Sequence, residues 1–284
     1  MEKFNSKILV EPDDNFTPEV RAWSLEKYKL VGSYCDIFTN SMKDKWNQLV
    51  YIDLFAGAGY SKITETGNTY LSSALLAMSI PNPFTKYILC EEDIDRYTAL
   101  QNRVKKDFSH LDVTIINGDS NKIIDQVYKS IPPFNKGNTL LPFCFVDPYS
   151  LNLHFNTIEK LGSKMLMDFL ILQALHMDGN RNLAKYLKEE NEKIALYLGN
   201  NNWREEFNPS CNNYSTNFVK FLADQYLNNM KSMGYVPEKN MHQIRSNEKN
   251  LPLYYLGYYS KHPRGVDLYK KVEKYLTQQT KLEF

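Results

Sequence analysis

Acidic residues and glycines gather at the ends of apolar segments in the first half of the chain. The stretch YIDLFAGAGYSKI, residues 51 to 63, joins an acid to two glycines, and each of four apolar segments ends in an acidic residue: Asp53, Glu91, Asp119 and Asp147. Glycines allow a tight turn and a close approach of backbone N–H groups to a ligand, and carboxylates accept hydrogen bonds. This pattern predicts a binding site for a ligand with several donors.

The elements that must position these residues alternate along the sequence. Apolar, strand-like segments are expected in LVYIDLFAG, KYILCEED, VTIINGD (113–119), LPFCFVDP and MDFLILQAL. Helices are expected from the Thr17-Pro18 N-cap to about Lys45, from Leu71 to Ile80, from Asp95, at about 122–130 and in NTIEKLGSKM. Strands that are apolar on both faces and alternate with helices indicate a parallel sheet covered on both sides. We therefore expect an α/β fold with a doubly wound, mostly parallel sheet.

The C-terminal third predicts an extension of this sheet. Residues 181–199 and TNFVKFLADQYLNNMKSMG are expected to be helical, the second helix ending at Gly234. GYVPEKNMHQIR and PLYYLGYYS are expected to form an antiparallel hairpin, followed by the closing helix VDLYKKVEKYLTQQ. We expect one Rossmann-type domain over 1–284, with an arm and helix (1–47), a cofactor-binding core (48–178) and a helical and hairpin segment (179–284).

Composition narrows the class of protein. Lys and Arg number 34 against 33 Asp and Glu, so the net charge does not advertise a polyanionic partner, although local basic patches are compatible with one. Four scattered cysteines and the lack of an apolar leader or a long apolar run favour a cytoplasmic protein without membrane association. The five histidines have no metal-ligand spacing relative to the cysteines, so no metal is expected.

The ligand of such a sheet sits beyond the carboxyl ends of its strands. A nicotinamide dinucleotide is disfavoured, because Lys62 stands where its fingerprint needs a third glycine and an 11-residue loop precedes the next helix. A ligand with an ammonium group, a ribose diol and an adenine amino group suits acids at three successive strand ends, which points to S-adenosylmethionine. The predicted cofactor-binding residues are Asp53, Phe55, Gly57, Gly59, Glu91, Asp119 and Ser120. Two simpler interpretations stay open, a plain tight turn for FAGAG and an N-cap for Asp119.

The fourth strand end indicates the reaction. Asp147-Pro148-Tyr149 resembles the D-P-P-Y signature of amino-methyltransferases, with one proline missing. In that signature the acid and a proline carbonyl accept hydrogen bonds from an exocyclic amine, and the aromatic ring stacks on the base, so catalysis is mostly positioning. A plain turn at the end of the strand is the alternative. A cytosine-C5 mechanism is disfavoured because the chain has no Pro-Cys dipeptide to supply a nucleophile.

The order of motifs resembles the three-Cys-motif partner proteins over nearly the whole chain. This bacterial family has a methyltransferase-like Rossmann fold and is usually encoded beside a protein with three cysteines in a radical-enzyme-like motif. The matching pieces are YIDLFAGAG, ILCEED, FVDPYS, YYSKHPRGVDLYKK and, in the first helix, Trp23, Lys27 and Tyr34. AGAGY is also similar to a family of ribosomal RNA adenine-N6 methyltransferases.

The resemblance implies S-adenosylmethionine binding, with Asp147, Pro148 and Tyr149 at the transfer site, and the nearby three-cysteine protein as a partner. Lys261, His262 and Arg264 form either a basic patch for a phosphate or carboxylate or a polar turn before the final helix. We expect a methyltransferase acting on an amine such as that of a nucleobase in RNA or DNA. The alternative is a catalytically silent or partner-dependent cofactor-binding subunit in bacterial defence or modification.

Overall fold

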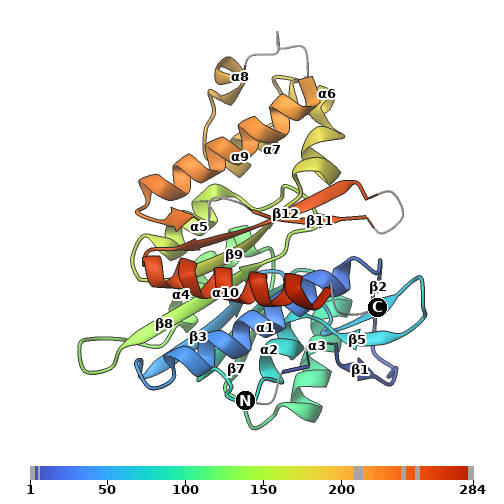
Figure 1. Cartoon of the computed structure of the whole chain (residues 1–284), viewed down its shortest axis with the longest axis vertical. Coiled ribbons are helices and arrows are strands. Elements are labelled where there is room, and N and C mark those ends of the chain that lie inside the picture. Colours follow the sequence, from blue (N-terminus) through green and yellow to red (C-terminus); the bar gives the residue numbers. More distant parts are fainter. Residues whose placement is uncertain (1–3, 6, 208–213, 238–240, 247–249, 281–284) are drawn as a thin grey trace. The chain divides into compact units, whose positions relative to one another are not determined.

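A computed structural model describes residues 4–5, 7–207, 214–237, 241–246 and 250–280 (Figure 1). The chain divides into two compact units. The first comprises Met1–Phe145 and Arg264–Phe284, and the second comprises Val146–Pro263. The candidate cofactor residues belong to the first unit, and Asp147, Pro148 and Tyr149 belong to the second.

A parallel sheet forms the centre of the first unit. Its strands lie in the order β8 (Leu140–Val146), β3 (Gln48–Asp53), β6 (Lys86–Glu91) and β7 (Val113–Asn117). β8 is buried along its whole length and β3 along all but its first residue, as expected for strands covered on both faces. Strand order reverses between β3 and β8, and this is where an open parallel sheet binds its ligand. The sequence-based expectation of a parallel sheet is confirmed.

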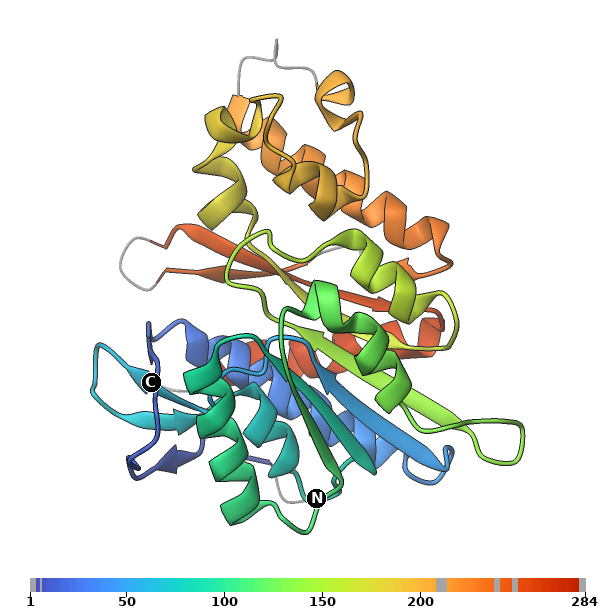
Figure 2. The same cartoon turned by 180° about the vertical axis from the view of Figure 1, so that it is seen from behind.

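Helices cover both faces of this sheet (Figures 1 and 2). α1 (Ser24–Met42) and α10 (Pro263–Thr280) lie on the side seen in Figure 1, and α4 (Ser120–Ser130) lies on the side seen in Figure 2. The ring of Tyr34 in α1 is 4.7 Å from that of Phe143 in β8 and 6.1 Å from that of Tyr269 in α10. α3 (Ile94–Asp107) begins at the N-cap Asp93, whose carboxylate accepts from the N–H groups of Asp95 and Arg96.

The expected helix start at Thr17-Pro18 is wrong. α1 begins at Ser24, and the preceding Glu19–Val20 forms strand β2, which pairs in parallel with β4 (Tyr60–Ile63). The N–H of Lys62 donates to the carbonyl of Pro18 at 3.0 Å, so the backbone here is bonded to a strand rather than to a helical turn. Thr17-Pro18 has the residue types of a helix start, but pairing with β4 decides its structure, and the local sequence does not reveal that pairing.

The expected loop between Gly59 and the next helix is a hairpin. β4 pairs antiparallel with β5 (Thr69–Leu71), which also pairs with β1 (Leu9–Val10). Gly67, with φ of +74°, allows the turn between β4 and β5. Leu71 therefore belongs to a strand, and α2 is shorter than expected, Ser73–Met78.

The second unit combines an antiparallel sheet with helices. β12 (Pro252–Ser260) pairs antiparallel with β9 (Asp168–Gln173), β10 (Val236–Pro237) and β11 (His242–Arg245). This confirms the expected hairpin, although residues 247–249 of its turn lie outside the described residues. α5 (Phe155–Gly162), the π-helix η1 (Leu175–Asn180), α8 (Trp203–Glu206) and α9 (Tyr214–Ser232) complete the unit.

The expected continuous helix over 181–199 is wrong, because it is divided into α6 (Leu183–Tyr186) and α7 (Lys193–Leu198). Nη2 of Arg204 donates to the carbonyls of Tyr186 at 2.9 Å, of Lys188 at 2.6 Å and of Asn191. A side chain from a later segment thus satisfies carbonyls that a continuous helix would have bonded itself.

Three cysteines, Cys35, Cys90 and Cys144, are buried as free thiols, and Cys211 lies outside the described residues. Within the described part of the chain, no helix is long and apolar enough to cross a membrane. The same residues contain no group of three His, Cys, Asp or Glu side chains that could hold a metal ion.

Candidate functional site

Asp53 ends β3 and fixes the start of the glycine turn that follows. Its carboxylate is fully buried and accepts hydrogen bonds from the hydroxyl of Ser73 at 2.9 Å, the hydroxyl of Tyr51 at 3.1 Å and the N–H of Phe55 at 3.1 Å. Burial, and then the charge of Asp53, raises the pKa of Tyr51 well above its usual range, so this hydroxyl stays a donor. Asp53 orients the backbone from within the protein, and its direct contact with a ligand stays a prediction.

The glycine turn crosses the ends of three strands. The N–H of Leu54 donates to Phe145 of β8 at 3.2 Å, and the N–H of Ala56 donates to Cys90 of β6 at 2.8 Å. Gly57 and Gly59 have φ of +66° and +86°, which side chains rarely adopt. A Cβ on Gly57 would have no atom within 4 Å, whereas one on Gly59 would lie 2.8 Å from Cδ1 of Leu75. Gly57 therefore faces open space, and Gly59 serves packing.

Glu91 ties the end of β6 to this turn. One carboxylate oxygen accepts the N–H of Gly57 at 2.8 Å, and the other accepts the N–H of Asp93 at 2.9 Å. The residue is 8% exposed, and burial raises the pKa of its carboxyl group. Because each carboxylate oxygen has two lone pairs, one protein bond on each leaves acceptor capacity for a ligand.

The end of β7 carries the last two predicted cofactor residues. Asp119 is the N-cap of α4 and accepts the N–H of Asn121 at 3.0 Å, so the capping interpretation is correct. Its side chain is 24% exposed and lies 3.5 Å from Nζ of Lys122. Ser120 is buried and donates to the carbonyl of Leu54, which joins α4 to the glycine turn. The first unit thus brings all the predicted cofactor residues to neighbouring strand ends.

Asp147, Pro148 and Tyr149 follow β8 and lie in the second unit. Asp147 is half-buried, Pro148 is buried and Tyr149 is 78% exposed, which leaves its ring accessible for stacking. The next residues are anchored, because the N–H of Leu151 donates to Asp178 at 2.8 Å and the hydroxyl of Ser150 accepts from Nζ of Lys193 at 2.9 Å.

Asp178 is a buried anchor that the sequence did not reveal. In addition to Leu151, its carboxylate accepts from the amide of Asn182 at 2.7 Å and from the hydroxyl of Tyr186, and it lies 3.0 Å from Nζ of Lys193. Burial opposes ionisation, but the hydrogen bonds and the charge of Lys193 hold the pKa of Asp178 below its usual range. Its local sequence, LHMDGN, is typical of an exposed turn.

Lys261, His262 and Arg264, the three candidate basic residues, differ in burial and in bonding partners. Nζ of Lys261 donates to the carbonyl of Gly162 at 2.5 Å and lies 5.1 Å from the centroid of the Tyr235 ring, and burial lowers its pKa. His262 is exposed, with its N–H bonded to Ser260, and Arg264 is an exposed residue at the start of α10. The structure gives Lys261 an internal partner, and a substrate role for the three residues stays a prediction.

Comparisons with known proteins relate the chain by structure. No family model matches it, and no curated protein matches it by sequence. Protein LPL1258 of Legionella pneumophila is 12% identical with a TM-score of 0.52, covering 88% of this chain and 90% of that one. An O-methyltransferase from Bacillus cereus in complex with SAH is 10% identical, with a TM-score of 0.46 over 81% and 80%. TomG, an O-methyltransferase from Streptomyces achromogenes in complex with SAM, is 13% identical, with a TM-score of 0.45 over 84% and 81%.

The structure and these comparisons define the fold class of the chain. The chain has an α/β fold with a doubly wound, mostly parallel sheet, and its candidate binding residues stand at the carboxyl ends of β3, β6 and β7. The sequence identities to these three proteins are 10 to 13%, so the likenesses concern the fold alone.

Proposed function

We propose that the protein is an S-adenosylmethionine-dependent methyltransferase. The observation that carries the proposal is the 2.8 Å hydrogen bond from the N–H of Gly57 to Glu91. It joins a glycine turn at one strand end to a carboxylate at the next, beside the point where strand order reverses. Backbone donors and a neighbouring carboxylate suit a ligand with a carboxylate, an ammonium group and a ribose diol.

The residues present fit this cofactor. Glu91 keeps acceptor capacity for the ribose hydroxyls, and the open space beside Gly57 permits a close approach to the turn. The partly exposed carboxylate of Asp119 suits the adenine amino group as an acceptor. The cofactor supplies a methyl group on a sulfonium centre, and these residues bind and orient it.

Glu91→Gln is expected to weaken S-adenosylmethionine binding about tenfold, because an amide removes the charge and places an NH2 group against one backbone donor. Isothermal titration calorimetry with S-adenosylmethionine and S-adenosylhomocysteine measures this. The matched control is the exposed neighbour Glu92→Gln, which should leave the affinity within twofold. Equal affinity in the wild type and Glu91→Gln, with both proteins folded, contradicts the assigned role of Glu91.

Asp147, Pro148 and Tyr149 are proposed to position the methyl acceptor. Phe145 is the register partner of Asp53, and Asp147 follows two residues further along the chain. The carboxylate of Asp147 would accept from an amine, and the exposed ring of Tyr149 would stack on a nucleobase, so that the nitrogen lone pair is aimed at the methyl group. RNA or DNA is the proposed substrate class, with Lys261, His262 and Arg264 as contacts to phosphate.

Asp147→Ala is expected to lower methyl transfer about 30-fold while S-adenosylmethionine affinity stays within twofold, because one charge-assisted hydrogen bond to the acceptor is lost. Transfer of labelled methyl groups to separate pools of RNA and DNA measures this. The exposed Asp224→Asn is the control. Unchanged transfer in Asp147→Ala excludes the proposed role of this side chain.

A second candidate function rests on the shortened motif, in which Tyr149 directly follows Pro148. In this alternative the chain is a cofactor-binding subunit that is silent alone and works with the three-cysteine-motif protein encoded nearby, as its resemblance to that partner family suggests. Co-purification of the two proteins, with no methyl transfer by the isolated wild type, favours this function. Transfer by the isolated chain favours the first.

A further inference from the structure

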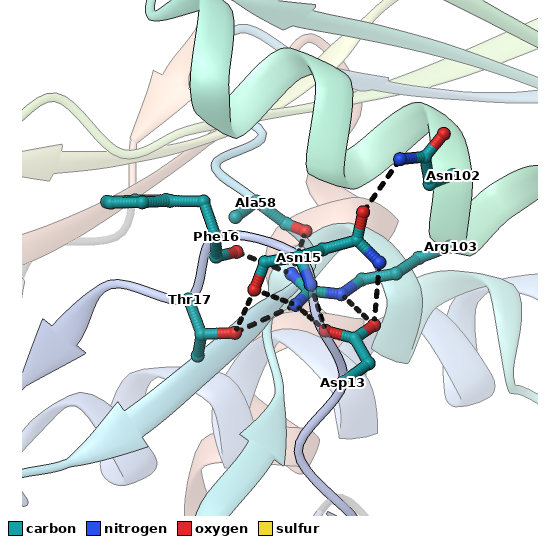
Figure 3. Close-up of polar contacts among 7 residues, drawn as sticks. All are labelled: Asp13, Asn15, Phe16, Thr17, Ala58, Asn102 and Arg103. Atoms are coloured by element: carbon teal, nitrogen blue, oxygen red, sulfur yellow. Dashed lines mark hydrogen bonds and ion pairs between the residues drawn. The ribbon is translucent and has the colours of Figure 1, made fainter.

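Arg103 is a buried charge on α3 that lies outside the predicted site residues, and it is 1% exposed. Figure 3 shows its guanidinium group at the centre of a set of polar contacts with residues 13–17, which we call the N-terminal strap. Nε and Nη2 donate to the two carboxylate oxygens of Asp13 at 3.0 and 2.5 Å. Nη2 also donates to the hydroxyl of Thr17 at 2.7 Å, and Nη1 donates to the carbonyl of Phe16 at 3.0 Å.

The same side chain holds the glycine turn. Nη1 donates to the carbonyl of Ala58 at 2.7 Å, and Ala58 stands between Gly57 and Gly59 (Figure 3). The guanidinium carbon lies 4.0 Å from the centroid of the Tyr60 ring, which continues the chain from the turn into β4. One planar group with five N–H donors therefore joins the strap to the turn, and a lysine amine cannot span these directions.

A second link attaches only the strap. The side-chain amide of Asn102, the neighbour of Arg103 on α3, donates to Oδ1 of Asn15 at 2.7 Å. Asn102 is exposed, and within the described part of the chain its side chain makes no hydrogen bond to the turn. Substitution of Asn102 therefore affects attachment of the strap alone, whereas substitution of Arg103 affects attachment of both the strap and the glycine turn.

We propose that Arg103 is a positioning residue for cofactor binding, which fixes the carbonyl of Ala58 and couples the order of the N-terminal strap to the geometry of the glycine turn. The proposal rests on the proposed S-adenosylmethionine site. Because Gly57 and Gly59 leave the turn with wide backbone freedom, the conformation that binds ligand needs restraint from outside the turn. Coupling is reciprocal, so bound cofactor must also stabilise the strap.

The test compares Arg103→Lys with three controls. Lys106→Met removes an exposed charge from the same helix, and Asn102→Ala loosens only the strap. Val127→Ala removes buried volume in the second half of α4, at a residue that makes no hydrogen bond to the turn through its side chain. Amide hydrogen exchange of the ligand-free protein reports on residues 54–60 and on the strap, and calorimetry reports S-adenosylmethionine affinity.

Arg103→Lys should speed exchange in both segments and weaken affinity about tenfold. Lys106→Met and Val127→Ala should keep the affinity within threefold, and Asn102→Ala, which leaves the bond of Arg103 to the turn in place, should weaken it by less than Arg103→Lys does. Equal affinity in the wild type and Arg103→Lys overturns the proposal and leaves the proposed function standing. Weakened affinity with unchanged exchange in 54–60, or an equal loss in Val127→Ala, also overturns it. A wild type that binds no S-adenosylmethionine removes the proposed function, and the cofactor role of Arg103 with it.

Discussion

Gly59→Ala is expected to destabilise the first unit by about 3 kcal/mol or more, the sum of a left-handed backbone cost and overpacking. The added Cβ would lie 2.8 Å from Cδ1 of Leu75 and 3.2 Å from Cδ1 of Leu100, at a φ of +86°. Both leucines are 0% exposed, so neither side chain can move out into solvent to make room for the new methyl group. Urea denaturation followed by circular dichroism measures the change in the free energy of unfolding.

Gly57→Ala is the matched control, because its φ of +66° carries a similar backbone cost while its Cβ would meet no atom within 4 Å. Its stability should fall by only about 1 kcal/mol. Its new methyl group would occupy the open side of the turn, so this folded variant should lose S-adenosylmethionine affinity. Equal stability losses at the two glycines would show that the packing of Leu75 and Leu100 does not discriminate between them.

The core of the first unit could be predicted from sequence because its signals are local and repeated. LVYIDL and LPFCFV are apolar at successive positions, which fits strands buried on both faces, and each is followed by an acid and a turn. Those strand ends meet on one edge of a parallel sheet by topology alone. The grouping of Asp53, Gly57 and Glu91 therefore followed from strand order without any knowledge of side-chain contacts.

The parts that could not be predicted depend on partners distant in sequence. Glu19 and Val20 form a strand because β4 offers a pairing edge, and Arg204 divides an expected helix by bonding carbonyls of residues 186–191. Arg103 and Asp178 look like ordinary polar residues in NRVKKD and HMDGN. Their burial is a property of the packed structure, since no local pattern distinguishes a buried charge with partners from a solvated one.

Asp168, at the start of β9 in the second unit, is expected to make stability depend on pH. Its carboxyl group accepts a hydrogen bond from the hydroxyl of Tyr258 at 2.7 Å and one from Ser260. Burial raises its pKa from the ordinary 3.8 to about 6, against the opposing hydrogen bonds and the charge of His262. Between about pH 4 and pH 6, this carboxyl group is therefore protonated in the folded state and ionised in the unfolded chain.

The contribution of this group to the free energy of unfolding is fully present below pH 3.8, its pKa in the unfolded chain. It is lost as the pH rises through about 6, its pKa in the folded state. The pKa difference corresponds to about 3 kcal/mol. Relative to the wild type, Asp168→Asn should therefore gain about 3 kcal/mol in unfolding free energy between pH 4 and pH 7.5, because an amide has no proton to lose. Urea denaturation at several pH values measures this difference, in which the shared titrations of other groups cancel.

Asp224→Asn, an exposed change in α9 of the same unit, should follow the wild type at every pH. A constant difference between Asp168→Asn and the wild type would mean that Asp168 titrates alike in the folded and unfolded states. Since Tyr258 and Ser260 belong to β12 and Asp168 to β9, we also expect protonation of this carboxyl group to stabilise the pairing of these two strands. Hydrogen exchange along β12 should then slow as the pH falls from 7 to 5, beyond the intrinsic effect of pH on exchange.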